Sequence, residues 1–136
     1  MAIWGAGEGA ELALNLKLGG SDVRLLDAKA AYAPANYVGS RAVVIGGMLA
    51  HFGVAVETGQ TLKRLEEGAA VFAGSDGSET RVEIDNIVIC QGRTANNDLA
   101  SALNGKGVPV QTIGDARQPR SYANAIHEAA YLVRQL

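Results

Sequence analysis

The sequence has few of the residues that form disulfides, metal centres or membrane anchors. A single cysteine, Cys90, excludes an internal disulfide and any C-x-x-C redox pair. Cys90 and the two histidines, His51 and His127, do not have the spacing of a metal site. No apolar run approaches the ~20 residues that span a bilayer. We therefore expect no disulfide framework, no metal and no membrane association.

Charged residues are also few, and their signs nearly balance. They make up 19% of the chain and leave a net charge of −2 at pH 7, with no basic cluster. This composition has no electrostatic footprint for DNA or RNA, so no nucleic-acid partner is expected. The first residues lack the basic start and the long apolar core of a signal peptide, which makes a cytoplasmic location the default prediction.

Apolar residues and glycines are plentiful. The 136 residues are 48% hydrophobic, which is enough for a globular domain with its own core. The 17 glycines separate short apolar segments, as in α/β domains with tight turns. Strands are predicted over residues 2–4, 21–27, 54–58, 61–65, 69–73, 80–84, 85–92 and 110–113. Turns separate the three from 61 to 84 and indicate an antiparallel β-meander. The strand over 85–92 is expected to be buried.

Residues 8–20 fit two structures. Four leucines alternate with other residues as in a strand, at Leu12, Leu14, Leu16 and Leu18. In that case a turn over 19–22 would lead into a hairpin partner. The absence of β-branched residues and the wealth of Ala, Leu, Glu and Lys favour a helix instead, ended by the two glycines that follow. We favour the helix.

Three further helices follow from the sequence. In residues 41–54, apolar side chains at helical spacing predict a helix, on Ala42, Ile45, Leu49 and Phe52. A short helix is expected at 98–103, inside a polar loop region. The final helix follows residues 119–121, with an apolar face of Tyr122, Ala125, Ile126, Ala129, Leu132 and Val133. Residues 28–40 are expected to form a loop.

The stretch IWGAGEGAE, residues 3–11, places a glycine-rich loop directly after the first strand. Gly5, Gly7 and Ala10 fit the pattern G-x-G-x-x-G/A. The first glycine permits a tight turn, the second lets the backbone approach a pyrophosphate, and the third position must be small so that helix and strand can pack. Backbone N–H groups at the helix start would face the anion. The residues predicted to bind a dinucleotide are Gly5, Ala6, Gly7, Glu8, Gly9 and Ala10.

Asp27 follows the second strand, about 20 residues after the glycine loop. A carboxylate there can accept both hydroxyls of an adenosine ribose and would repel a 2′-phosphate, so it favours NAD over NADP. Lys29, with the opposite charge, weakens that preference. The alternative is a tight turn without a ligand, in which Asp27 only ends a strand.

A second ligand class competes for the same loop. Gly5, Gly7 and Gly9 also fit G-x-G-x-G, a pattern typical of S-adenosylmethionine-dependent methyltransferases. Those enzymes usually carry an acid two residues before the first glycine, where this chain has Ile3. The predicted meander and the Gly-Asp-Ala segment near the end do not belong to that fold. The dinucleotide is therefore the favoured ligand.

The last part of the chain resembles a known family of flavoproteins. It reads VQTIGDARQPR over residues 110–120 and AIHEA over 125–129. This is similar to I-G-D-A/C-x-x-P-R followed by A-I/V-x-E-G in the group of 2,4-dienoyl-CoA reductase, 2-enoate reductase and trimethylamine dehydrogenase, with Ala129 in place of the last glycine. ICQGRTANNDL, residues 89–99, resembles the family's A-x-G-R/x-x-P-N-x-x-L, with Ala95 in place of proline.

The resemblance implies an α/β fold, with a Rossmann-like parallel sheet, crossover helices and a small antiparallel β-meander. Residues 1–106 match an inserted NAD(P)-binding domain, and residues 107–136 match the returning end of an FAD-type domain. The chain then looks like a fragment of a parent enzyme that also has a barrel and the rest of the flavin domain. Gly92 is assigned to the dinucleotide site, and Gly114 and Asp115 to FAD, with Asp115 on the ribityl chain.

The function expected from these features is the binding of NADH for hydride transfer to flavin in an enoate or dienoyl-CoA reductase-like enzyme. FAD would bind through the tail only in the complete parent, and no residue of this chain is expected to be catalytic. A non-catalytic ADP-binding or structural domain of an amine dehydrogenase-like flavoprotein is the alternative. Exposed apolar surface on the tail also predicts pairing between copies of the chain.

Overall fold

The computed structural model describes residues 1–32 and 40–135. Its contacts divide the chain into two compact units, Met1–Gly92 and Arg93–Leu136, and each is considered by itself. This division falls earlier than the predicted domain boundary between residues 106 and 107. The structural division follows contacts, whereas the predicted one follows a family resemblance and stays a prediction. Most of the loop expected at 28–40 lies outside the described residues.

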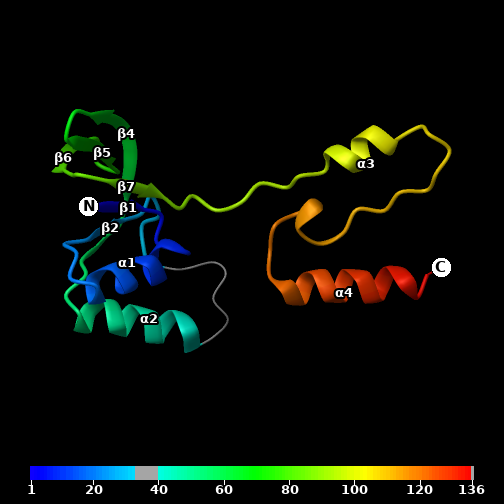
Figure 1. The fold of residues 1–136 in the computed structure, drawn as a ribbon, viewed down its shortest axis with the longest axis horizontal. Helices are drawn as coiled ribbons and strands as arrows, with labels where there is room; N and C mark the ends of the chain where they lie inside the picture. Colours follow the sequence, from blue (N-terminus) through cyan, green and yellow to red (C-terminus); the bar gives the residue numbers. More distant parts are fainter. Residues whose placement is uncertain (33–39, 136) are drawn as a thin grey trace. The chain divides into compact units, whose positions relative to one another are not determined.

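The first unit is built on a four-stranded parallel sheet. The strand order is β3 (Val56–Glu57), β2 (Arg24–Leu26), β1 (Ala2–Trp4) and β7 (Ile87–Ile89). Helices α1 (Gly9–Leu18) and α2 (Ser40–His51) lie on one side of this sheet, and the β-meander lies on the other (Figure 1). The predicted Rossmann-like α/β fold with a small antiparallel sheet is confirmed.

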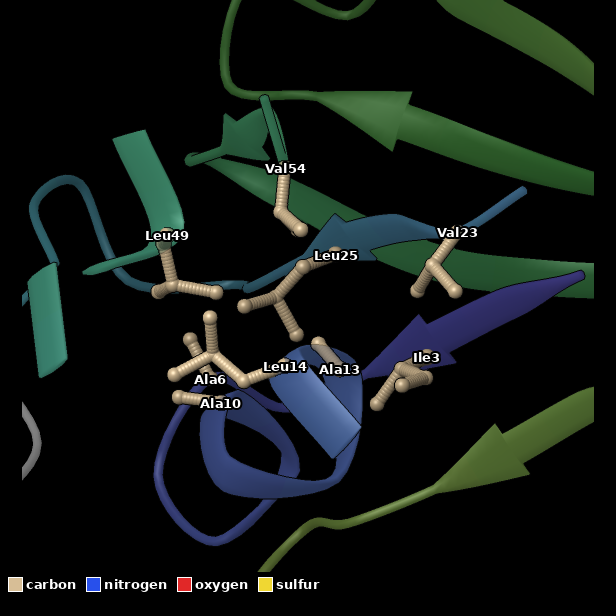
Figure 2. Packing of buried hydrophobic residues seen from close by; sticks show 9 residues of the cluster. All are labelled: Ile3, Ala6, Ala10, Ala13, Leu14, Val23, Leu25, Leu49 and Val54. Atoms are coloured by element: carbon tan, nitrogen blue, oxygen red, sulfur yellow. The ribbon is translucent and has the colours of Figure 1, made fainter. Parts of the chain in front are cut away.

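Both faces of the parallel sheet are buried, one under the helices and the other under the meander. Successive residues of a strand point to opposite faces, so they contribute to different sides. The face toward the helices carries a cluster of Ile3, Ala6, Ala10, Ala13, Leu14, Val23, Leu25, Leu49 and Val54 (Figure 2). The face toward the meander carries a second cluster of Ala2, Leu26, Ala70, Phe72 and Val82. Neighbouring residues of one strand, such as Leu25 and Leu26, therefore belong to different cores. This is why β1 is apolar throughout and β2 ends in two adjacent leucines, rather than either strand alternating.

The meander has the predicted antiparallel order β4 (Gln60–Glu66), β5 (Ala69–Gly74) and β6 (Glu79–Glu83). Its central strand is the most deeply buried, and Phe72 at its middle is fully inaccessible. The outer strand β4 is mostly exposed. The meander thus serves as the cover of the sheet's second face.

The ambiguous stretch at residues 8–20 is a helix, so the strand interpretation was wrong. Helix α1 turns Ala10, Ala13 and Leu14 toward the parallel sheet. The N–H of Gly19 donates to the carbonyl of Asn15 at 3.0 Å, and Gly20 follows with a φ of +86° that favours glycine. Burial of one side of the helix against Ile3 and Leu25 is the tertiary term that decides the matter.

Helix α2 is also confirmed, although its apolar face is only partly covered. Leu49 is buried, Ile45 is half-buried, and Phe52, just beyond the helix, is 37% exposed. Gly46 faces the ring of Tyr32, where an added Cβ would lie 3.2 Å from Cε1. The glycine pair in this helix therefore includes one close-packed position, as expected for a helix and not for a phosphate loop.

Strand β7 differs from the expected buried strand at 85–92. It is shorter, and its last residue, Ile89, is 54% exposed. The reason is topological, since among the described residues β7 pairs only with β1 and forms an edge of the sheet. Edge strands keep one row of backbone groups and part of their side chains in contact with solvent.

The second unit contains α3 (Asp98–Leu103), the 3-10 turn η1 (Gly114–Ala116) and α4 (Tyr122–Val133). Both predicted helices are confirmed, but the predicted strand at 110–113 was wrong. Neither sheet of the described residues includes 110–113, and a strand cannot form without a neighbour to share its hydrogen bonds. The predicted apolar face of α4 is also largely uncovered in this unit, with Tyr122 83% and Ile126 62% exposed.

No helix in the described ranges is long and apolar enough to cross a membrane. The same ranges contain no group of three or more metal-ligating side chains that could hold an ion.

Replacement of the central meander side chain tests the second core. Phe72→Ala should lower the free energy of unfolding of the chain by about 3–5 kcal/mol, because it leaves a cavity under the sheet. Urea denaturation followed by circular dichroism measures this change. The exposed Leu65, at 54%, provides the matched control, and Leu65→Ala should cost less than about 1 kcal/mol. Equal losses for the two variants would contradict the assignment of Phe72 to the core.

Candidate functional site

The glycine loop lies at the carboxyl ends of three neighbouring parallel strands. Residues from the loop, from the end of β2 and from the end of β7 line one pocket, made of Gly5, Gly7, Glu8, Asp27, Lys29, Cys90, Gln91 and Gly92. Ligands of open parallel sheets bind at this edge, in the crevice outside the carboxyl ends. The structure thus brings together five residues predicted for the dinucleotide site, namely Gly5, Gly7, Glu8, Asp27 and Gly92.

Gly5 is required by the fold itself. Its φ of +113° disfavours any side chain, and a Cβ on it would lie 1.9 Å from the carbonyl oxygen of Cys90. The N–H of Gly5 donates to the carbonyl of Leu26 at 2.7 Å, and the N–H of Cys90 donates to the carbonyl of Trp4 at 2.7 Å. The turn after β1 is therefore held from the strands on both sides.

Gly7 has a different environment from Gly5. A Cβ on Gly7 would meet no atom within 4 Å, and its φ lies outside the range that favours glycine. Neither the packing nor the backbone therefore needs a glycine at this position. The space above its backbone belongs to the pocket, which is where a ligand backbone contact would require the absence of a side chain.

The close packing of helix and strand is shared between two residues. Ala10 is completely buried, as its predicted role as the small third position requires. Gly9 is more tightly constrained, since a Cβ there would lie 2.7 Å from Cγ2 of Ile3. Gly9 is thus best explained by helix packing rather than by a ligand.

Asp27 is buried beside the loop, with 8% of its surface exposed. Oδ2 accepts the N–H of Ala6 at 2.6 Å, and Oδ1 accepts the N–H of Lys29 at 2.8 Å. The backbone of Asp27 is held as well. Its N–H donates to the backbone carbonyl of Glu57 at 2.9 Å, and its carbonyl accepts the N–H of Gln60 at 2.8 Å. The predicted position of Asp27 next to the glycine loop agrees with the structure, but the sequence did not reveal these internal bonds.

Cys90 lines the pocket but has the properties of a packing residue. Burial, together with the negative charge of Glu8, raises the pKa of its thiol. A raised pKa lowers the thiolate fraction, which is the reactive form. This environment does not favour Cys90 as a nucleophile.

Gln91 also lines the pocket, although the sequence did not predict it as a site residue. Its position directly after β7 could have indicated it.

The predicted flavin-facing residues, Gly114 and Asp115, lie in the second unit within a polar network. One oxygen of Asp115 accepts from Arg93 Nη1 at 2.7 Å, and the other accepts the N–H of Arg120 at 3.2 Å. The N–H of Gly114 donates to Glu128 Oε2 at 2.7 Å, and Arg120 pairs with the other oxygen of that carboxylate. Helix α4 thereby holds the Gly-Asp-Ala turn through Glu128.

Glu128 was not singled out from the sequence. The N–H of Gly114 lowers the pKa of its carboxyl group, and Arg120 and Arg117 lower it further against the opposing effect of desolvation. Its side chain is 18% exposed, on the side of α4 that faces the turn. The family pattern A-I/V-x-E-G could have indicated Glu128, because the pattern has glutamate at this position.

Comparisons with known proteins agree with this fold. A family model described as "Pyridine nucleotide-disulphide oxidoreductase" matches residues 1–128. A metal reductase from Desulforamulus reducens is 34% identical over 59 residues, which cover 43% of this chain and 9% of that protein. The chain therefore spans only a small part of this curated relative.

Solved structures with the same fold are also much longer than this chain. A 2-naphthoyl-CoA reductase in complex with 2-naphthoyl-CoA matches with a TM-score of 0.76 and 23% identity, over 93% of this chain and 19% of its own. Histamine dehydrogenase from a Rhizobium species matches with 0.81 and 20%, over 99% and 22%. An amine oxidase for 6-hydroxypseudooxynicotine from Pseudomonas geniculata matches with 0.82 and 16%, over 96% and 21%. These likenesses show the fold.

The two loop glycines should respond differently to alanine. Gly5→Ala should lower the free energy of unfolding by at least about 2 kcal/mol, because the new Cβ collides with the Cys90 carbonyl and the backbone is strained. Gly7→Ala should change it by less than about 1 kcal/mol, since the space around it is open. Thermal unfolding of the two variants measures the contrast. A large loss for Gly7→Ala would show that this glycine also serves the fold.

The hold of Glu128 on the turn should depend on pH. Because the pKa of Glu128 is lowered in the folded protein, its stabilising effect is complete above the ordinary value of 4.5 and is lost as the pH falls through the lowered pKa. Hydrogen exchange of the Gly114 amide should thus be faster in Glu128→Gln than in the wild type near neutral pH, and this difference should shrink as the pH falls through the lowered pKa of Glu128. Asp98→Asn, in the same unit, is the control and should leave this amide unchanged. A difference that stays constant across an acid titration of the folded chain would exclude the charge as its cause.

Proposed function

This chain belongs to the pyridine nucleotide-disulphide oxidoreductase family, and we propose that its glycine loop binds NADH. The family, together with the fold shared with a 2-naphthoyl-CoA reductase and a histamine dehydrogenase, supports the context of a flavoprotein oxidoreductase. The proposed role of the chain is to hold NADH for hydride transfer to a flavin. NADH supplies the hydride when it is bound, and this chemistry is the cofactor's own.

The observation that carries this proposal is the open backbone at Gly7. The fold explains the glycines at positions 5 and 9 by close contacts, but it offers no such reason at position 7. A pyrophosphate lying against the backbone at the start of α1 supplies the reason, because a side chain there would keep the phosphates away. The ten-residue helix α1 directs its N-terminal end to the same pocket. The loop proposed for NADH comprises Gly5, Ala6, Gly7 and Glu8, with Asp27 and Gly92 beside it, whereas Gly9 and Ala10 act as the small residues that let helix α1 pack on the strand.

NADH is proposed rather than NADPH because of the charge on the pocket wall. The carboxylate of Asp27 lies beside the loop, and a 2′-phosphate close to it would be repelled. Lys29 also lines the pocket, and its positive charge reduces this preference for NADH.

The parent enzyme is proposed to be of the enoate or dienoyl-CoA reductase type. The support is the family resemblance of the tail and the shared fold with a 2-naphthoyl-CoA reductase. In that parent, Gly114 and Asp115 would contact FAD, and the first half of the FAD-type domain would supply the rest of the FAD site. A separate barrel domain would belong to the same parent. The acceptor groups of Asp115 suit the hydroxyls of a ribityl chain, although Arg93 and the Arg120 N–H already donate to them.

A second candidate function is a non-catalytic ADP-binding module of an amine dehydrogenase-like flavoprotein. The observation in its favour is that histamine dehydrogenase and the amine oxidase match the fold with TM-scores of 0.81 and 0.82, above the 0.76 of the reductase. Such a module would use the same loop and the same Asp27 for the ADP moiety alone. The family match and the meander disagree with a methyltransferase, because both belong to the flavoprotein fold.

Calorimetry with the purified chain separates these functions. NADH should bind at least about tenfold more tightly than ADP if the nicotinamide half contributes to the site. Gly7→Val should abolish the binding of both, because its side chain occupies the place of the pyrophosphate. Gly47→Ala in α2, a glycine in equally open space, should leave both affinities unchanged. ADP binding as tight as NADH binding would favour the second candidate, and no binding of either would contradict the dinucleotide proposal.

A further inference from the structure

We propose that Asp27 is a positioning residue that latches the glycine loop, and that it acts on the dinucleotide mainly through this loop. The inference rests on the proposed function, because it concerns the same site. It changes the role of the carboxylate, which the sequence motif assigns to the ribose hydroxyls of the ligand.

The first argument is where the two carboxylate oxygens are bonded. Oδ2 accepts the N–H of Ala6, the residue between the two loop glycines, at 2.6 Å. Oδ1 accepts the N–H of Lys29 at 2.8 Å, in the segment that leaves β2. With only 8% of its surface exposed, Asp27 has little contact with water, so its oxygens depend on these N–H groups for their hydrogen bonds.

The second argument is that the bond to Ala6 completes a row of contacts between the loop and β2. The N–H of Gly5 donates to the carbonyl of Leu26 at 2.7 Å, and the next N–H along the chain donates to the next residue, Asp27. Ala6 itself is 2% exposed and packs in the core cluster beneath the helices. The N–H of Ala6 thus points to the end of β2, and its hydrogen bond with Asp27 holds the loop in this conformation.

The third argument is that Asp27 is a firm anchor. Its N–H donates to Glu57 at 2.9 Å, its carbonyl accepts from Gln60 at 2.8 Å, and the neighbouring Lys29 carbonyl accepts from Gly59 at 2.7 Å. These bonds tie the end of β2 to the segment that joins β3 and β4. A carboxylate on so fixed a backbone can hold a loop in one conformation, at the cost of freedom to follow a ligand.

A latch and a ribose ligand make different predictions for the two ribose hydroxyls. If Asp27 works through the loop, its loss weakens the binding of any ligand that places phosphates on the loop, whether or not the ligand has those hydroxyls. If Asp27 bonds the ribose, its loss matters only where the hydroxyls are present. A cycle of two protein variants and two ligands separates these effects.

The experiment measures ADP and 2′,3′-dideoxy-ADP binding to this chain by calorimetry, with Asp27→Asn against the wild type. We expect Asp27→Asn to weaken both ligands by the same factor, about tenfold or more, because the amide group brings a donor to a place that needs acceptors. Asp22→Asn, an exposed carboxylate before the same strand, removes the same charge and should change neither affinity. A loss confined to ADP would overturn the latch and establish the ribose contact.

A measurement without ligand keeps the two proposals apart. In the free chain, the amide of Ala6 should exchange at least about tenfold faster with solvent in Asp27→Asn than in the wild type, whereas the Gly5 amide should change less. Unchanged protection of Ala6 would overturn the latch even if nucleotides bind. Failure of the wild type to bind either nucleotide would contradict the proposed function, and the Ala6 amide would still decide the role of Asp27.

Discussion

The approach of the Cys90 carbonyl to the backbone of Gly5 is the constraint on which the site depends. A Cβ at this position would lie 1.9 Å from that oxygen, so the end of β7 can come this close to the turn after β1 only because residue 5 has no side chain. The same turn is bonded to Leu26 on the opposite side. The carboxyl ends of β2, β1 and β7 therefore lie close together, and the residues that follow them line the pocket.

The covered second face of the sheet makes this arrangement stable. The meander buries Ala2 and Leu26 under Phe72, while α1 and α2 bury the alternate residues on the first face. With both faces occupied, the edge at the carboxyl ends is where polar groups of the sheet can meet a ligand. Asp27 illustrates the outcome, because it follows the buried Leu26 directly and turns its carboxylate to the glycine loop.

The second unit follows a different principle. None of the apolar side chains among its described residues is buried, and charged and polar hydrogen bonds surround the Gly-Asp-Ala turn. Glu128 and Arg93 hold the two residues that the family resemblance assigns to a flavin. The sequence motif assigned Gly114 and Asp115 to a flavin site. Their hydrogen-bond partners, Arg93 and Glu128, are distant from them in the sequence.

The sequence by itself determined the elements whose signals are local. The glycine spacing after a short apolar segment, the helix-forming composition before Gly19 and the meander turns each predicted their element correctly, because backbone preferences and burial patterns act over a few residues. Tertiary structure decided what depends on neighbours. Among the residues that the structure describes, 110–113 have strand character but no sheet partner, and β7 is an edge rather than a buried strand. The carboxylate of Asp27 bonds the loop. Hydrogen bonding across the fold sets these outcomes, and a linear sequence does not contain the positions of the partners.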